Sequence, residues 1–432
     1  MNTVPTARSR TPLRQYLFDL TLHGIKLGLD NIQALVRAAD DPHLAYPTVH
    51  VGGTNGKGSV VAMLAAMLSA AGYRVGRFTS PHLIDVSERF LINGEAIPES
   101  ALEENIQFFR EIAEGMAQCP TFFEMNTAIA FRYFAQEKVD IALIEVGMGG
   151  RFDSTNVVQP LVTAITNIDL DHTAFLGDTI KAIATEKAGI IKQGVPLVTT
   201  ETQSEALGVF HLRAAEADAP VLQVMKDFDF RLEGAPWEQR LTYVSAERSL
   251  VDVPLGLAGS CQGANAAVAV ALAGELVSAF PELTQEHMET GLAKVAWPCR
   301  LEKVLDDPPV IIDVAHNRAG TERLAELFDE CVVVFAASSD KDAEGMLAAL
   351  RPKARHLILT QFEGKRATPV EELATDLEPG SYHRDERLGD AILRGLALAS
   401  AECPLLITGS IYAAGEARQY LIEEHGATPL TF

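Results

Sequence analysis

The segment GGTNGKGS, residues 52–59, places a lysine and a serine among glycines. An apolar stretch precedes it and an apolar stretch with helical spacing follows, so it is expected to join a buried strand to a helix. The backbone N–H groups of such a turn can bind an anion, and the helix N-terminus adds its positive end. We expect Lys57 to reach the terminal phosphates of a nucleotide and the Ser59 hydroxyl to contact Mg²⁺. The extra Gly58 departs from the common phosphate-loop spacing, and a glycine turn without a ligand is the weaker alternative.

Two further side chains are expected at the edge of the same sheet. Glu145 ends the apolar stretch IALIE, and His172 follows another apolar stretch in the segment LDHT. The carboxyl ends of parallel strands are where α/β proteins place ligand groups, and a buried carboxylate is costly unless it is paired or metal-bound. With Ser59, these residues could form a Mg²⁺ shell, although Mg²⁺ prefers oxygen ligands. For His172, purely structural hydrogen bonding is an equal alternative.

A second group of candidates begins at a break in the pattern, the pair Trp297–Pro298, which suits a hinge between domains. Arg300 follows it directly and could bind a phosphate group, with an exposed surface arginine as the alternative. Asp313 ends the apolar stretch VIID, and His316 lies just beyond it. Both are expected to face a cleft between the two domains.

Extended apolar stretches alternate with helical patterns along the chain, which indicates parallel sheets flanked by helices. The expected strands form two series, at 47–53, 139–147, 161–168 and 195–200, and then at 308–317, 331–339, 356–360 and 403–410. The expected fold class is α/β: a doubly wound ATPase domain containing a P-loop, followed by a smaller Rossmann-like α/β domain. We place these domains at residues 1–297 and 298–432. Residues 201–258 form the least regular part of the first.

The composition bounds the class of protein. The chain of 432 residues is long enough for two or three domains, and 47% hydrophobic with 22% charged residues is typical of a globular protein. A net charge of −22 argues against partners such as nucleic acid or an anionic membrane surface. No apolar stretch is long enough to span a bilayer, and five cysteines without CxxC spacing indicate a reducing compartment. We expect a monomeric cytoplasmic protein with small-molecule partners.

Eight further segments add to TNGKGS and occur in the order IKLGLDNI, TSPHL with SERFLINGE, TFFEMNTAIAF, EVGMGGRFDSTN, NIDLDHTAFLGDTIKAIATEKAGIIK, DVAHN, SDKD and TGSIYAAGE. In these segments, over nearly its whole length, the sequence resembles the folylpolyglutamate synthase/dihydrofolate synthase branch of the Mur-type amide ligases. An ordered set of this kind is far more specific than a single glycine-rich loop.

The resemblance implies a set of site residues. Nucleotide contacts are implied for Asn55, Gly56, Lys57, Gly58, Ser59, Asn265, Arg300 and Asp313. Metal-binding positions are implied at Ser59, Ser80, Glu145, His172 and Lys187. Contacts to a pterin-bearing substrate are implied for Lys26, Leu27, Gly28, Thr121, Phe122, Phe123, Glu124, Phe152, Asp153 and Ser154. Catalytic roles are implied for Lys57, His172, Lys187, Asp313 and His316.

Two of these assignments have a simpler alternative. The family places the lysine matching Lys187 at the metal site as a carbamate, since a desolvated neutral amine can add CO₂ and become an anionic oxygen ligand. On the sequence alone, a surface lysine paired with Glu186 or a nearby acid is favoured, and the match of EKAGI to the family reverses that preference. The pair Phe122 and Phe123 could stack on a flat heterocycle, but adjacent aromatic residues are more often part of a core.

Three positions depart from the family's pattern. Cys261 stands where the family usually has histidine, Cys299 replaces a glycine, and Arg318 replaces a proline. Because the first two lie close to Asn265 and Arg300, the geometry around the nucleotide or the hinge is expected to differ there. We expect both cysteines to be buried small apolar residues rather than reactive thiols.

The resemblance implies formation of an amide bond with ATP as co-substrate and Mg²⁺ as cofactor. A pteroate or folate carboxylate would take the γ-phosphoryl group, and the amine of L-glutamate would then attack the acyl phosphate, leaving ADP and phosphate as the other products. The sequence leaves open whether dihydropteroate, (tetrahydro)folate polyglutamates or both are used. The alternatives are a P-loop ATPase that needs no amino acid and a non-catalytic nucleotide-binding relative.

Overall fold

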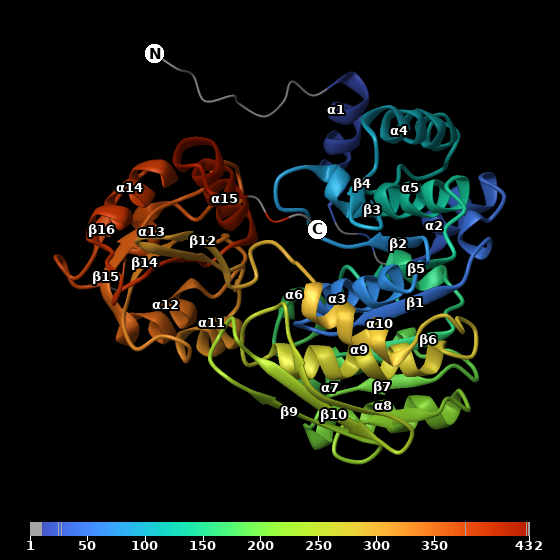
Figure 1. Cartoon of the computed structure of the whole chain (residues 1–432). Helices are drawn as coiled ribbons and strands as arrows, with labels where there is room; N and C mark the ends of the chain where they lie inside the picture. The colour runs from blue at the N-terminus through green and yellow to red at the C-terminus, as the bar shows by residue number, and fades with distance from the viewer. Residues whose placement is uncertain (1–10, 25, 27, 376, 429, 431–432) are drawn as a thin grey trace.

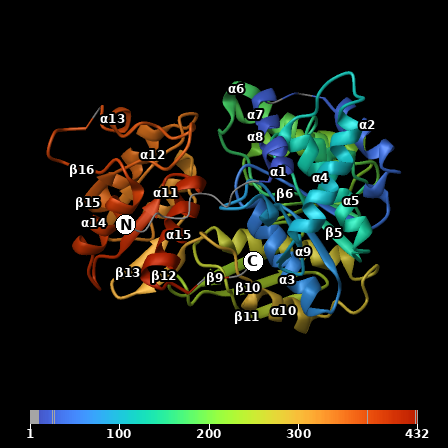
Figure 2. The same cartoon turned by 90° about the horizontal axis from the view of Figure 1, so that it is seen from above.

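A computed structural model describes residues 11–24, 26, 28–375, 377–428 and 430 of the chain. Its largest sheet has the strand order β4-β3-β2-β5-β1-β6-β7-β8. Six neighbouring strands of this sheet run parallel to one another, namely β2, β5, β1, β6, β7 and β8. At one edge, β3 and β4 add an antiparallel hairpin. A six-stranded sheet of order β12-β13-β17-β14-β15-β16 lies beside it in the last third of the chain (Figures 1 and 2).

The strands of the largest sheet are β1 (Thr48–Gly52), β2 (Val75–Phe78), β3 (Phe90–Ile92), β4 (Glu95–Ala96), β5 (Ile141–Glu145), β6 (Val162–Ile165), β7 (Leu197–Thr199) and β8 (Val221–Gln223). A three-stranded antiparallel sheet consists of β9 (Phe228–Glu233), β10 (Arg240–Ser245) and β11 (Ser249–Pro254). The six-stranded sheet consists of β12 (Glu302–Asp306), β13 (Pro309–Ile312), β14 (Cys331–Phe335), β15 (Ala354–Leu359), β16 (His383–Arg384) and β17 (Leu405–Thr408).

The helices before residue 295 are α1 (Pro12–Asp19), α2 (Asp30–Ala38), α3 (Lys57–Ala70), α4 (Glu99–Ala113), α5 (Phe122–Gln136), α6 (Thr173–Leu176), α7 (Ile180–Lys187), α8 (Ser204–Glu216), α9 (Gln262–Leu276) and α10 (Gln285–Lys294). The later helices are α11 (Arg318–Ala325), α12 (Ala343–Leu350), α13 (Val370–Leu373), α14 (Leu388–Leu398) and α15 (Ile411–His425). We call the elements through α10 the N-terminal part, residues 295–301 the linker, and the elements from β12 the C-terminal part.

Helices cover both faces of the largest sheet. Successive residues of a strand point to opposite faces, so neighbouring residues pack against different helices. In β5, Ile141 and Leu143 pack with α3, α9 and α10, whereas Ala142 and Ile144 pack with α2, α4 and α5. Every residue of β1 and β5 is buried. Continuous apolar stretches are therefore the pattern that a doubly covered parallel sheet produces.

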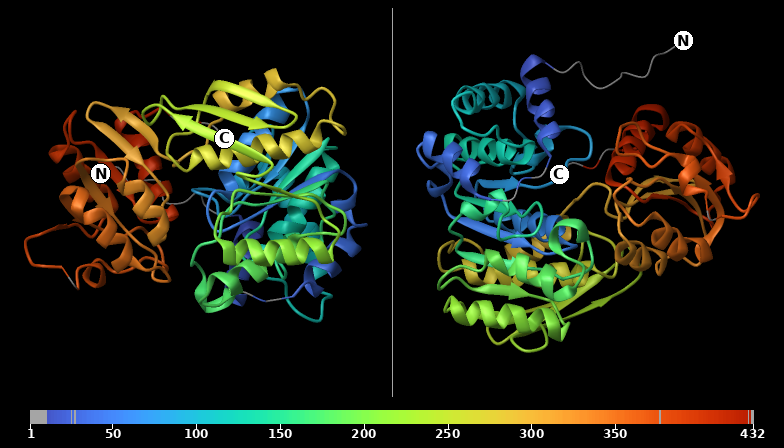
Figure 3. Two further views of the ribbon diagram at one scale, coloured as in Figure 1. Left: turned by 90° about the horizontal axis from the view of Figure 1, so that it is seen from below. Right: turned by 180° about the vertical axis from the view of Figure 1, so that it is seen from behind.

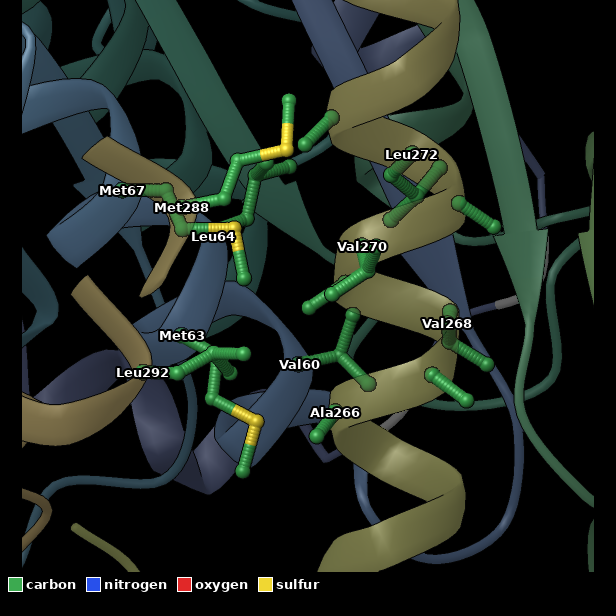
Figure 4. Packing of buried hydrophobic residues seen from close by; sticks show 14 of the residues in the cluster. Val60, Met63, Leu64, Met67, Ala266, Val268, Val270, Leu272, Met288 and Leu292 are labelled. Atoms are coloured by element: carbon green, nitrogen blue, oxygen red, sulfur yellow. The ribbon is translucent and has the colours of Figure 1, made fainter. Parts of the chain in front are cut away.

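The packing of α3, α9 and α10 holds the start of α3 in place, and with it the glycine-rich segment 52–59. Figure 4 shows side chains of α3 interdigitating with those of α9 and α10, among them Met67 and Met288. The helices α3 and α10 cross so closely that a Cβ on Gly291 would lie 2.5 Å from the backbone nitrogen of Met67. Because α3 packs against the sheet and against these two helices, its first residues are fixed relative to the sheet.

The structure confirms the expected α/β class and both series of strands. The region 201–258 differs from the expectation, since it contains α8, β8 and the three-stranded sheet, which contacts α9 on the side away from the main sheet (Figures 1 and 3). Across the described part of the chain, no helix combines the length and the hydropathy that a membrane span needs.

Candidate nucleotide and ligase site

The loop between β1 and α3 has a backbone that only glycine can form at two positions. Gly53 has φ 132°, and a Cβ there would lie 1.9 Å from the hydroxyl oxygen of Thr166. Gly56 has φ 87°, and a Cβ there would lie 2.2 Å from the side-chain oxygen of Asn265. The N-cap residue of α3 is Gly56, so the cap position has no side chain to bind the first N–H groups of the helix. The first turn of α3 is therefore left to an anionic ligand.

Hydrogen bonds from the segment that follows β6 also hold this loop. The N–H of Thr54 donates to the carbonyl of Asn167 at 2.8 Å, and the N–H of Asn55 donates to the side-chain oxygen of Asn167 at 3.0 Å. The hydroxyl of Thr166 donates to the carbonyl of Asn55 at 2.6 Å. The loop is thus preformed by hydrogen bonds within the protein.

Two lysines meet at one carbonyl of this loop. The ammonium of Lys57 donates to the carbonyls of Gly53 and Thr54, each at 3.0 Å, and Nζ of Lys187 donates to the same Gly53 carbonyl at 2.9 Å. Burial, followed by the charge of Lys57, lowers the pKa of Lys187 to about 7. Lys187 ends α7 and is 5% exposed, so the alternative of a surface lysine paired with Glu186 or a nearby acid is wrong.

Glu145 and Ser80 lie next to each other across neighbouring strands. Glu145 ends β5 and is 5% exposed, and its Oε2 accepts a hydrogen bond from the N–H of Ser80 at 3.0 Å. Burial raises the pKa of Glu145, and the charge of Lys57 opposes that shift. Ser59 is buried in the first turn of α3. These residues and His172 line the same cavity.

His172 differs from the other residues implied for a metal. It has φ 51°, serves as the N-cap of α6, and is exposed. Within the described residues, no group of three or more histidine, cysteine, aspartate and glutamate side chains is arranged to hold a metal ion. Glu145 and His172 would therefore need further oxygen ligands to complete a Mg²⁺ site, such as the hydroxyls of Ser59 and Ser80 and an oxygen from the ligand or from a modified lysine.

The linker packs against the phosphate-loop helix. Trp297 is 8% exposed, and a Cβ on Gly58 would lie 3.1 Å from its ring. The guanidinium of Arg77 lies 4.6 Å from the centroid of the same ring. Three residues further on, Arg300 lines the cavity. The indole thus fixes the linker against α3, and through the linker it fixes the position of Arg300 at the cavity.

Asp313 shapes the C-terminal side of the cavity. Its two carboxylate oxygens accept hydrogen bonds from the N–H of Leu301 at 2.9 Å and from the N–H of Ala315 at 2.7 Å. Nδ1 of His316 donates to the carbonyl of Val314 at 2.9 Å, and burial lowers the pKa of His316 to about 4. His316 is therefore a neutral imidazole at neutral pH.

An ion pair and hydrogen bonds join the N-terminal and C-terminal parts at the cavity. Lys341 forms an ion pair with Asp171 at 2.8 Å, and both side chains are 11% exposed. The side-chain amide of Asn317 donates to Asp171 at 3.2 Å and to the side-chain oxygen of Asn55 at 3.1 Å. Sequence reasoning did not assign Asp171, Asn317 or Lys341, although each lies in a segment that carries the family resemblance.

The cavity between the parts has a volume of about 720 Å³. Its lining includes all the residues proposed from the sequence for nucleotide, metal and catalysis, namely Asn55, Gly56, Lys57, Gly58, Ser59, Ser80, Glu145, His172, Lys187, Asn265, Arg300, Asp313 and His316. The structure therefore brings this set together. None of the described residues implied for the pterin-bearing substrate lines that cavity.

The substrate candidates on α5 have strong structural roles. Thr121 and Glu124 form a capping box, in which Oε2 of Glu124 accepts from the N–H of Thr121 at 2.6 Å and also from Asn31 at 3.2 Å. Phe123 packs so tightly that a Cβ on Gly147 would lie 2.4 Å from its ring. Gly147 lines the cavity, so Phe123 links α5 to the nucleotide site.

Phe122 stays accessible for a ligand. It is partly exposed, its ring centroid lies 5.5 Å from that of Phe18, and the guanidinium of Arg89 lies 5.2 Å from it.

The remaining substrate candidates divide into exposed and structural residues. Phe152 is 38% exposed beneath the guanidinium of Arg151. Asp153 is 7% exposed and accepts hydrogen bonds from the N–H groups of Met148 and Thr155, each at 2.9 Å. Its neighbour Ser154 is buried.

The candidates near the N-terminus lie in an open region. The ammonium of Lys26 donates to the carbonyl of Cys119 at 2.8 Å. Gly28 has φ 131°, and a Cβ there would have no atom of the described residues within 4 Å. Leu27 lies outside the described residues.

The three residues that depart from the family's pattern have different surroundings. Cys299 is buried in the linker with φ 57°, in the region of φ that glycine favours. Cys261 is exposed, so the expectation of a buried residue is wrong for it. It is the N-cap of α9, and an N-cap residue at a cavity wall keeps contact with solvent. Arg318 is exposed and pairs with Glu322.

Comparisons with known proteins agree with this geometry. Residues 51–273 match the Mur ligase middle domain, and residues 299–411 match the Mur ligase, glutamate ligase domain. A dihydrofolate synthase/folylpolyglutamate synthase of Bacillus subtilis (strain 168) is 38% identical over 94% of this chain and 98% of its own length. A Mycobacterium tuberculosis folylpolyglutamate synthase solved with ADP superimposes with a TM-score of 0.88 at 32% identity, covering 97% of this chain and 99% of its own.

Escherichia coli FolC, solved in complex with DHPP and ADP, superimposes with a TM-score of 0.85 at 29% identity, covering 97% of this chain and 100% of its own. The two-part α/β fold and the matched domains define an ATP-dependent, amide-bond-forming ligase of the Mur type. Within that class, the chain belongs to the folylpolyglutamate synthase/dihydrofolate synthase family.

Proposed function

We propose that the chain joins L-glutamate to dihydropteroate, to (tetrahydro)folate polyglutamates, or to both, through an acyl phosphate formed with ATP. A carboxylate oxygen of the pterin-bearing substrate attacks the γ-phosphorus, and ADP leaves. The glutamate amine then attacks the acyl carbon, the C–O bond to phosphate breaks, and the amine loses a proton. Products are the amide, ADP and phosphate.

The observation that carries this proposal is the preformed glycine loop in a cavity that both parts of the chain line. The first turn of α3 and the ammonium of Lys57 bind the β- and γ-phosphates and disperse the charge that develops on the transferred group. Asn265, Arg300 and Asp313 hold the rest of the nucleotide. His316, a neutral imidazole at pH 7, lies at the C-terminal wall of the cavity, where it can hydrogen-bond the incoming glutamate.

The donor set fits Mg²⁺, which prefers hydroxyl and carboxylate oxygens. Ser59, Ser80, Glu145 and His172 would hold the ion or ions. When bound, Mg²⁺ neutralises charge on the phosphate oxygens. The buried Glu145 carboxylate is the observation that supports a cation here, since a buried carboxylate is costly unless it is paired or metal-bound.

Lys187 is proposed to carry a carbamate. Two ammonium groups at the single Gly53 carbonyl would repel each other, and a neutral Lys187 amine removes that repulsion. Addition of CO₂ to the amine, with loss of a proton, gives an anionic oxygen ligand of the kind that Mg²⁺ prefers. This proposal predicts that a Lys187→Ala variant recovers activity with added short-chain carboxylic acids, while wild-type enzyme loses activity when CO₂ is removed.

The pterin-bearing substrate is proposed to lie along Lys26, Leu27, Gly28, Thr121, Phe122, Phe123, Glu124, Phe152, Asp153 and Ser154. Phe122 offers a face to a flat heterocycle, and Phe123 leads from it towards Gly147 at the edge of the cavity. Asp153 and Glu124 then act mainly by fixing their loops, because their carboxylates are already hydrogen-bonded.

We further propose that the chain is a monomer in the cytoplasm. The structural halves are proposed to correspond to a domain at 1–297, which binds ATP and the pterin-bearing substrate, and a domain at 298–432, which presents glutamate. Closure of the two would shield the acyl phosphate from water.

An ADP-release assay tests the proposed function. Dihydropteroate and tetrahydrofolate are each supplied with ATP and Mg²⁺, with and without L-glutamate. We expect ADP release above background only when both co-substrates are present. ADP release that is indifferent to glutamate would indicate a P-loop ATPase instead, and tight ADP binding without any turnover would indicate a non-catalytic relative.

A further inference from the structure

One close approach between the two parts of the chain lies outside the nucleotide cavity, between α15 and the loop after β2. A Cβ on Gly415, in the second turn of α15, would lie 2.3 Å from the carbonyl oxygen of Leu83 and 2.9 Å from its carbonyl carbon. The helix lies on the side of the C-terminal part that faces the rest of the chain (Figure 1). Any side chain at Gly415 would collide with backbone of the N-terminal part.

Leu83 completes this contact with its side chain. It belongs by sequence to the N-terminal part, yet it packs against the buried apolar cluster of the C-terminal part that includes Ala414 and Ala417 of α15. Its loop therefore inserts an apolar residue next to α15 while its carbonyl lies against Gly415. The glycine makes this docking possible because it presents no side chain there.

The loop side of the contact is rigid. The carboxylate of Glu88 accepts hydrogen bonds from the N–H groups of Leu83, Ile84 and Asp85 at 2.7, 3.1 and 2.9 Å. At the start of the same loop, the N–H of Ser80 donates to Glu145 at 3.0 Å. Movement of Leu83 would consequently disturb the segment that carries Ser80.

The helix side is also rigid. Arg418, one turn after Gly415, forms a buried ion pair with Glu302 of β12 at 2.8 Å, with side chains 8% and 1% exposed. The same Glu302 accepts a hydrogen bond from the N–H of Cys299 in the linker at 2.8 Å. Helix α15 is thus tied to its own sheet and to the linker that leads to Arg300.

We propose that Gly415 is a positioning residue, which seats α15 on the Leu83 carbonyl and so fixes the C-terminal part, with Arg300 and His316, against the Ser80 loop. Because neither side of the contact can yield locally, a methyl group at Gly415 must separate the two parts. Its effect on turnover rests on the proposed ligase reaction, whereas its effect on domain placement does not.

The test compares two variants that add the same methyl group to a helix. Gly415→Ala introduces the collision, whereas Gly208→Ala in α8 is the control, because no atom of the described residues lies within 4 Å of a Cβ there. Alanine is the better helix former at both positions, so neither helix is weakened. Circular dichroism verifies folding, small-angle X-ray scattering with ADP and Mg²⁺ measures the radius of gyration, and ADP release measures kcat.

We expect Gly415→Ala to have a larger radius of gyration than wild type and a kcat lowered by about tenfold to a hundredfold, while Gly208→Ala matches wild type in both. A Gly415→Ala variant with the wild-type radius or the wild-type kcat overturns the proposal. So does an equal loss in both variants.

A second variant decides the question if Gly415→Ala does not fold. Leu83→Ala keeps the backbone of the loop and removes only the apolar contact, so it should expand the protein and lower kcat in the same direction. A wild-type radius and kcat in that variant overturn the proposal. If the wild-type chain itself shows no ligase activity, the proposed function fails, and the scattering comparison still tests the docking.

Discussion

The turns that follow β1 and β13 occupy the same place in two parallel sheets, each leading from a buried strand to a helix, yet they are built differently. After β1, Gly56 caps α3 without a side chain, and the helix N-terminus faces the cavity. After β13, the side chain of Asn317 caps α11 by accepting from the N–H of Gly320 at 2.8 Å. The first turn offers backbone donors to an anion, whereas the second binds one of its own donors and offers side chains.

The two turns therefore depend in different ways on how the two parts are placed. Backbone donors bind phosphate with little dependence on conformation elsewhere, and the loop that holds them is fixed by its own hydrogen bonds. The side chains of the C-terminal part and the linker that line the cavity, such as His316 and Arg300, face the glycine loop only when that part is docked. Substitutions in the first turn should therefore abolish chemistry directly, and substitutions at the contacts between the parts should act through placement.

The largest effect is expected for Lys57→Ala. Loss of the ammonium at the terminal phosphates should lower kcat by more than about a hundredfold and weaken ATP binding. Stability should change little, since burial already lowers the pKa of Lys57 and makes its charge costly in the free protein. ADP release and thermal melting measure these effects, with Lys226→Ala, at an exposed position, as the control. A near-normal kcat would show that this turn does not act on the terminal phosphates.

A smaller loss is expected for Glu145→Gln and His172→Ala. The glutamine can still accept from the N–H of Ser80, so folding should persist while the proposed charged metal ligand is lost. We expect the Mg²⁺ concentration for half-maximal activity to rise about tenfold to a hundredfold, with little change in Tm. A titration of activity with Mg²⁺ measures this. Variants that unfold, or that show an unchanged Mg²⁺ requirement, would mean that these residues are structural.

Lys341→Ala tests the contact between the parts at the edge of the cavity. Removing the partner of Asp171 leaves a largely buried carboxylate without its ion pair, so the C-terminal part should dock less well. We predict a kcat lowered about tenfold, with ATP affinity at the glycine loop changed less. Lys353→Ala, in the same part of the chain, serves as control. Equal kcat in the two variants would limit the placement argument to the contact at Gly415.

The smallest effect at neutral pH is expected for a histidine buried in the centre of the largest sheet. His50 lies in β1 beside the hydroxyl of Thr155 at 2.8 Å, whereas His356 and His383 of the six-stranded sheet are partly exposed. Burial, followed by the charge of Lys192, lowers the pKa of His50 to about 3. In the unfolded chain a histidine has a pKa of about 6.5.

Between these two pKa values the unfolded chain binds a proton that the folded chain does not. Stability should therefore fall as the pH decreases from about 6.5 towards 3, by up to about 1.4 kcal/mol per pH unit from this group. His50→Gln, which cannot titrate, should reduce that slope relative to the wild-type chain. Urea unfolding between about pH 7 and pH 4 measures both slopes. An unchanged slope for His50→Gln would contradict the assignment.

The sequence predicted those features that depend on neighbouring residues. The buried strands and the glycine loop follow from local pattern, because a parallel sheet covered on both faces requires continuous apolar stretches. The three-stranded sheet was not predicted, since exposed residues of β9 such as Asp229 and Arg231 alternate with less exposed ones and leave no apolar stretch. The ion pair of Asp171 with Lys341 joins residues far apart in sequence, which no local pattern indicates.

Transfer of oxygen from the substrate to phosphate distinguishes activation of a carboxylate from simple hydrolysis of ATP. The pterin-bearing substrate is prepared with ¹⁸O in its reacting carboxylate and incubated with ATP, Mg²⁺ and L-glutamate in unlabelled water. When the C–O bond of the proposed acyl phosphate breaks, the departing phosphate keeps one oxygen of the carboxylate. Mass spectrometry should therefore find one ¹⁸O in each phosphate released with the amide product. Phosphate that carries no ¹⁸O would contradict activation of the carboxylate at the glycine loop.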